Sequence, residues 1–196
     1  MNAVPDGRTV RWEHRDGELL AAATQYVLDH GVATLTMRPL AEAVGVTIAT
    51  LIRRFGSKDE LLEQICRSIH LDMLDTLAYD PELAGLDPRQ TLDVLWGRWL
   101  DPAQARQFTF LFELFGVALR DPDRYGWFAE SVISDWLAPI EDVLVEVGTE
   151  ISQARALATV VLSLLRGLHM DFAMTGDRDR VEAAYHLVVD AMASQL

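Results

Sequence analysis

The stretch that decides the fold is LTMRPLAEAVGVTIATLIRRFGSKDELL, residues Leu35 to Leu62. It predicts two short helices joined by a glycine turn and followed by a third helix. Gly45 ends the first of them, because glycine readily takes the left-handed conformation found at helix C-termini. Ser57 and Glu60 form an S-x-x-E capping box at the start of the third. Two helices around a glycine turn form a helix-turn-helix, whose second helix enters the DNA major groove by its N-terminal end.

Local rules also predict the caps and the inward face of this unit. Thr36 is expected to cap the first helix and Thr47 the second, because threonine hydroxyls accept hydrogen bonds from free N–H groups at helix starts. Helical spacing turns one set of side chains inward. This expected small core contains Leu40, Ala43, Val46, Leu51 and Phe55.

Polar and small residues are left on the outer faces around the start of the second helix. Their grouping indicates contact with nucleic acid, although a solvated surface has the same composition. The sole lysine, Lys58, lies at a helix N-terminus. The helix dipole disfavours a cation there, whereas a DNA phosphate would be a favourable partner for it. The candidate DNA-binding residues are Arg38, Thr47, Ile48, Ala49, Thr50, Ile52, Arg53, Arg54 and Lys58.

The same run resembles the DNA-binding signature of the TetR family of bacterial transcriptional regulators. The resemblance rests on Thr36, Arg38, Leu40-Ala41, Gly45-Val46, Thr50-Leu51, Phe55 and the run from Lys58 to Leu62. Ile52 stands where the family usually has tyrosine, and Arg54 stands where it usually has histidine. Ile52 therefore lacks a hydroxyl that in the family reaches DNA, whereas Arg54 adds a charge able to meet a phosphate. The resemblance implies an operator-binding homodimer controlled by a small molecule.

Charge is divided unevenly along the chain, whose 196 residues carry a net charge of −13. Residues 1–60 hold seven basic and eight acidic side chains, so this segment has a net charge of about −1 and the other 136 residues carry about −12. The acidic excess lies outside the predicted reading head, and we expect modest, salt-sensitive nonspecific affinity for DNA. Arg8, Arg11 and Arg15 lie in a polar N-terminal stretch that fits either a DNA-contacting arm or a plain tail.

Outside the signature the sequence predicts only helices. A first helix is expected over 17–30 and a fourth over 58–79, followed by helices near 89–100, 103–120, 124–147, 151–175 and 178–195. No alternating strand pattern persists, so the expected fold is all-α. An N-terminal three-helix helix-turn-helix DNA-binding domain with its arm, residues 1–57, is followed by a helical effector-binding and dimerisation domain, residues 58–196.

Aromatic side chains in the second domain are candidates for lining a ligand pocket. The helix over 104–120 is apolar nearly all round and is expected to be central. Pro139 is expected to kink its helix and open room for an apolar or aromatic effector. These side chains also suit plain core packing, and His169 also suits a buried structural role. The candidate pocket residues are Trp96, Trp99, Phe108, Phe112, Phe115, Trp127, Trp136 and His169.

The last two predicted helices carry apolar seams, and in the TetR family the corresponding helices pair across a two-fold axis. A dimer also follows from recognition, because two heads about 34 Å apart read a palindrome whereas one short helix reads too few base pairs. The seam residues are Ala154, Leu157, Ala158, Val161, Leu165 and Leu168 in one helix, and Val181, Ala184, Tyr185, Val188 and Met192 in the other.

Other classes of protein find less support in the sequence. Nucleophile elbows, glycine-rich phosphate loops and metal-ligand spacings are not recognisable, so neither an enzyme nor a cofactor or metal site is expected. The single cysteine, Cys66, forms no internal disulfide and favours a cytoplasmic protein. We expect no signal peptide and no membrane-spanning stretch. The remaining alternative is a helical small-molecule-binding or protein-interaction module without operator activity.

Overall fold

A computed structural model describes residues 7–193, with side chains over 16–101 and 104–192. Within residues 7–193 every regular element is a helix, which confirms the expected all-α fold. Contacts divide the chain into two compact units, Met1–Ser68 and Ile69–Leu196. The division falls inside α4 (Lys58–Tyr79), eleven residues beyond the predicted boundary. The functional meaning of the predicted domains stays a prediction.

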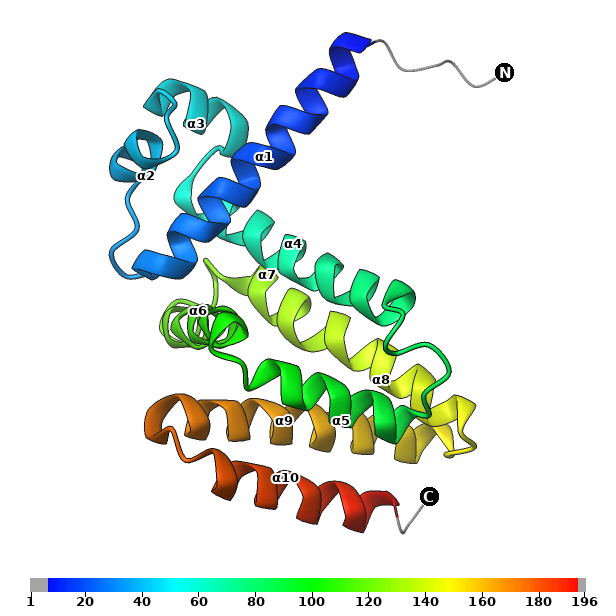
Figure 1. The fold of residues 1–196 in the computed structure, drawn as a ribbon. Coiled ribbons are helices and arrows are strands. Elements are labelled where there is room, and N and C mark those ends of the chain that lie inside the picture. The colour runs from blue at the N-terminus through cyan, green and yellow to red at the C-terminus, as the bar shows by residue number, and fades with distance from the viewer. Residues whose placement is uncertain (1–6, 194–196) are drawn as a thin grey trace. The chain divides into compact units, whose positions relative to one another are not determined.

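The first unit contains α1 (Gly7–His30), α2 (Met37–Ala43), α3 (Ile48–Phe55) and the first half of α4 (Figure 1). The helix expected over 17–30 begins ten residues earlier, so residues 7–15 of the predicted arm are helical. The side chains of Arg8, Arg11 and Arg15, like residues 1–6, lie outside the described part of the chain. Among the described residues, the buried core of the unit consists of Ala23, Val27, Val32, Leu35, Leu40, Ala41, Leu51, Phe55, Leu61, Leu62, Ile65 and Cys66.

Most of the predicted caps in this unit are present. Gly45 has φ +71, as the turn after α2 requires. The capping box of α4 is reciprocal, because Ser57 Oγ accepts from the Glu60 N–H at 3.2 Å and Glu60 Oε2 accepts from the Ser57 N–H. Thr36 occupies the N-cap position of α2 with extended backbone, but its side chain makes no capping hydrogen bond. Ala43 was expected in the core and is exposed.

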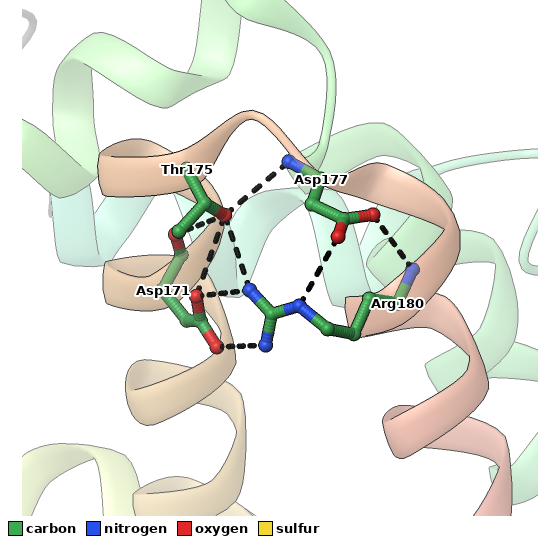
Figure 2. Close-up of polar contacts among 4 residues, drawn as sticks. All are labelled: Asp171, Thr175, Asp177 and Arg180. Atoms are coloured by element: carbon green, nitrogen blue, oxygen red, sulfur yellow. Dashed lines mark hydrogen bonds and ion pairs between the residues drawn. The ribbon is translucent and has the colours of Figure 1, made fainter.

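The second unit contains the rest of α4 and the helices that follow it (Figure 1). Within it α9 contacts α6, α8 and α10. The α9–α10 turn is left-handed at Gly176, with φ +67, and is closed by a polar network in which Arg180 binds Asp171, Thr175 and Asp177 (Figure 2). The helices are α5 (Pro88–Trp99), α6 (Pro102–Ala118), α7 (Gly126–Ala129), the π-helical turn η1 (Glu130–Ser134), α8 (Asp135–Glu146), α9 (Ile151–Thr175) and α10 (Arg178–Ala193).

Two expectations about the helices of this unit need correction. The single helix expected over 124–147 is divided into α7, η1 and α8, and the irregular turn precedes Pro139 by about one helical turn. The π-helical turn widens the helix about one turn before Pro139. Pro139 itself lacks the N–H that would continue the helical hydrogen bonds. In α6 only Phe110 and Leu114 are fully buried among its described side chains, so this helix is less central than expected.

The predicted seams of α9 and α10 pack inside the chain itself. Trp96 and Leu100 of α5 form a core cluster with Leu165, Val181 and Tyr185. Ala154 and Ala158 pack against α8 in a second cluster. The seam residues Ala154, Ala158, Leu165, Val181 and Tyr185 are therefore covered by their own chain, whereas the other seam residues are only partly buried and their role in a dimer stays a prediction.

A different stripe of α9 is open to solvent. It repeats at spacings of four and three residues, which places its members on one helix face. The exposed residues of this stripe are Ala156, Val160, Ser163, Gly167, Met170 and Met174. On α10, Ala183, Leu187 and Ala191 are likewise exposed at intervals of four. By length and mean hydropathy α9 also meets the requirements of a membrane span, contrary to expectation, although a core or interface helix meets them too.

Candidate nucleic-acid interface and candidate ligand pocket

The start of α3 is fixed by Thr47. Its hydroxyl accepts a hydrogen bond from the Thr50 N–H at 3.1 Å, and the two threonine hydroxyls lie 2.9 Å apart. The inward face of α3 is buried, since Leu51 and Phe55 are 0% and 2% exposed. Burial of this face holds the helix against α2 and leaves its other face directed to solvent.

The solvent-facing side of α3 brings together most of the predicted DNA-binding residues. Ile48 and Ile52 are 38% and 48% exposed, and Ala49 and Arg53 are also exposed. Arg38 is exposed in the first turn of α2, the helix that packs on α3. We call the six residues Arg38, Thr47, Ile48, Ala49, Ile52 and Arg53 the exposed α3 face.

Arg54 is turned away from this face and into the protein. Its Nη1 donates to Gln64 Oε1 of α4 at 3.1 Å, and its Nε lies 3.0 Å from Asp16 Oδ2 of α1. The guanidinium also lies over the Phe55 ring, 5.0 Å from the centroid. The extra charge relative to the family therefore ties α3 to α1 and α4, and its contact with DNA stays a prediction.

Lys58 is also held internally. Its half-buried ammonium donates to the Val32 carbonyl oxygen at 2.8 Å. Because that carbonyl follows the end of α1, the bond ties the start of α4 to the α1–α2 connection. Sequence reasoning missed this role, which depends on a residue 26 positions away.

The eight candidate pocket residues are distributed over three groups. Trp96, Trp99, Phe108 and Phe112 gather around His169. Phe115 and Trp127 both contact Phe128, at ring-centroid distances of 5.0 and 5.8 Å. Trp136 packs edge-on against His70, 5.2 Å away. Among the described residues, the ring contacts do not join these groups into one lining.

His169 is 2% exposed and stacks on Phe108, with ring centroids 3.8 Å apart. Its Nδ1 donates to the Leu165 carbonyl at 2.8 Å, since a carbonyl only accepts. Burial lowers the pKa of His169 below 6.5, partly offset by the carbonyls of Leu165 and Trp99, so the ring is neutral near pH 7. Nε2 then carries a lone pair, and it has no hydrogen-bond partner of acceptable geometry in the described structure.

Arg166 is a residue of this region that sequence reasoning missed. It lies one turn before His169 and its guanidinium is over the Phe115 ring, 5.5 Å from the centroid. An Nη2 hydrogen bond goes to the Val132 carbonyl of η1. Burial lowers the pKa of Arg166 to about 10, which leaves it charged at neutral pH. A sequence signal existed, because Arg166 is the only strongly basic residue between Arg155 and Asp171 of an otherwise apolar stretch.

The fold and the exposed α3 face define a protein of the helix-turn-helix class with a helical second unit. Residues 19–65 match the sequence model described as "Bacterial regulatory proteins, tetR family". The HTH-type transcriptional repressor KstR2 of Rhodococcus jostii (strain RHA1) is 33% identical over 95 residues, which are 48% of this chain and 46% of that protein. The match thus spans about half the length of this relative.

Solved structures resemble the chain over nearly its whole length. A transcriptional regulator from Rhodococcus sp. Rha1 is 20% identical with a TM-score of 0.74, covering 92% of this chain and 96% of that one. A transcriptional regulator from Saccharomonospora viridis, solved in complex with choline, is 19% identical with a TM-score of 0.70, covering 91% of this chain and 96% of that one. At these identities the likeness shows a shared fold. Residues 19–65 are thus similar in sequence to bacterial regulatory proteins of the tetR family, and the chain as a whole shares the fold of the solved regulators.

Proposed function

We propose that this chain is a cytoplasmic, DNA-binding transcriptional repressor that acts as a homodimer on a palindromic operator and releases it when a small molecule binds. The observation that carries the proposal is the exposed α3 face. Exposed Ile48 and Ile52 are costly on a surface that binds nothing, and they suit contact with thymine methyl groups. Arg38 and Arg53 are free to meet phosphates beside them.

The second copy in this proposal docks on the exposed stripe of α9 together with Leu187 of α10. Val160, Met170 and Leu187 are 48%, 49% and 72% exposed, so pairing them removes apolar surface from water. Small residues such as Gly167 allow two helices to approach closely. This surface replaces the internally buried seams as the proposed dimer interface.

Ligand release follows from differential affinity in the proposed mechanism. A small apolar or aromatic molecule in the second unit favours a form of the dimer whose heads no longer match successive major grooves. Because α4 contributes residues to both units, we assign it the transmission of this change. The complex with choline of the Saccharomonospora viridis regulator supports ligand binding by this fold.

Selection of bound DNA from a random-sequence duplex pool tests the function. The full chain is expected to enrich a palindromic sequence. Replacing both Arg38 and Arg53 by alanine is expected to weaken binding of the protein to this sequence, while the circular dichroism spectrum and the dimer mass remain unchanged. Enrichment of no sequence would favour a helical module that binds small molecules or proteins without operator activity.

A further inference from the structure

The crossing of α6 and α9 leaves a basic side chain among aromatic rings. In Figure 1 α6 is seen almost end-on while α9 runs across the view, so the two helices cross steeply. Phe115 of α6 meets Arg166 of α9 on one side, and Phe108 meets His169 on the other. We call Phe108, Phe112, Phe115, Arg166 and His169 the α6–α9 crossing.

Arg166 brings a positive charge to this crossing without a counter-charge. Among the described residues its contacts are the Val132 carbonyl and the Phe115 ring, and no carboxylate lies within ion-pair distance. A guanidinium has five N–H donors, of which this hydrogen bond uses one. Arginines withdrawn from water are normally paired with an acid, since removing an unpaired charge from water is costly. The remaining donors are therefore suited to an anion from outside the chain.

A second observation also indicates unmet hydrogen bonding at the crossing. Nε2 of His169 and Nε1 of Trp96 are buried without partners, and the two rings lie 4.8 Å apart in an edge-on arrangement. Each residue is 2% exposed. Buried polar atoms in native proteins nearly always have partners. The unsatisfied Nε2 of His169 lies one helical turn along α9 from Arg166 and offers a hydrogen-bond acceptor that no described protein group uses.

We propose that the α6–α9 crossing binds an amphipathic carboxylic acid, with its carboxylate on the Arg166 guanidinium and its apolar body against Phe115. The proposal rests on the proposed ligand control and specifies the class of effector. Guanidinium and carboxylate pair through two parallel hydrogen bonds. A single negative charge suits the site better than a doubly charged phosphate ester, because desolvating the second charge in these aromatic surroundings has no compensating cation.

Three variants separate this role from a structural one. Arg166→Met keeps an unbranched apolar stem over Phe115 and removes the charge. Arg166→Lys keeps the charge and loses the planar pair of donors. Arg155→Met is the matched control, since Arg155 is exposed on the same helix. Both Arg166 variants are expected to keep the wild-type circular dichroism spectrum and dimer mass.

Calorimetric titration of the full chain with 4-phenylbutanoate and octanoate, and with their uncharged amides, tests the proposal. The acids are expected to bind, and the amides to bind about tenfold or more weakly, since a hydrogen-bonded charge is lost. Arg166→Met removes the preference for the acid, Arg166→Lys weakens it, and Arg155→Met leaves it unchanged. Equal binding of acid and amide, unchanged binding by Arg166→Met, or no binding of either acid at millimolar concentration overturns it. If Arg166→Met fails to fold, Arg166→Lys and the acid–amide comparison still decide.

Failure of this inference is distinguishable from failure of the proposed function. Acid binding is measured without DNA, whereas operator binding is measured by fluorescence anisotropy with a duplex from the selection. An operator-binding dimer that ignores both acids overturns the inference alone. A chain that binds the acids through Arg166 but selects no DNA overturns the proposed function alone.

Discussion

Lys58 donates a hydrogen bond of 2.8 Å from its ammonium group to the backbone carbonyl of Val32. The bond joins the first residue of α4 to the segment after α1, and it satisfies a carbonyl of a residue that is only 2% exposed. At the sequence level a lone lysine at a helix N-terminus favoured a phosphate contact. The structure instead gives Lys58 an internal partner that offsets its unfavourable position at the helix dipole.

Replacing Lys58 by methionine is expected to lower the free energy of unfolding by about 1–2 kcal/mol, because the Val32 carbonyl loses a charged donor. Urea denaturation followed by circular dichroism measures this, with Arg67→Met as an exposed control on α4. A variant with unchanged stability and weakened operator binding would instead assign Lys58 to a phosphate.

Arg53→Gln is expected to weaken operator binding without destabilising the fold, since Arg53 is exposed on α3. If Arg53 meets one phosphate, the slope of log affinity against log salt concentration becomes shallower by about 0.9. Anisotropy titrations over a salt series measure the slope, and Arg67→Gln serves as the control. A slope equal to that of the wild type would place Arg53 outside the interface.

Glutamate at Val160 or Leu187 is expected to convert the dimer to a monomer, because a charge would be buried between two copies. Sedimentation velocity measures the mass, while circular dichroism reports whether helix content is kept. Leu119→Glu is the control, since Leu119 is 81% exposed and lies beyond the end of α6. Unchanged mass in both interface variants would exclude the exposed α9 stripe and Leu187 as the dimer surface.

Acidification is expected to destabilise the protein through His169. Burial holds its folded pKa below the ordinary 6.5, so the unfolded chain binds the proton first as the pH falls. The contribution is complete above about pH 6.5 and is lost as the pH falls from there toward the lower, folded pKa. Thermal unfolding from about pH 8 to about pH 5 should show a smaller midpoint loss for His169→Gln than for the wild type. Parallel pH profiles would show that His169 does not contribute.

Glycine turns and caps were predictable because they depend on residues a few positions apart. Gly45, Thr47 and the Ser57–Glu60 box appear as expected. Helix spacing likewise identified Leu51 and Phe55 as the inward face of α3. The directions of Arg54 and Lys58 were not predictable, because their partners Asp16, Gln64 and Val32 lie 10 to 38 positions away in the sequence.

The sequence by itself determined the all-helical architecture and the helix-turn-helix, since caps, glycine turns and helical periodicity are local properties. Tertiary structure alone decided which face of α9 is buried, because that helix is apolar on several sides and only its packing on α6, α8 and α10 selects among them. The same packing placed the Arg166 guanidinium over the Phe115 ring, where partial burial lowers its pKa to about 10.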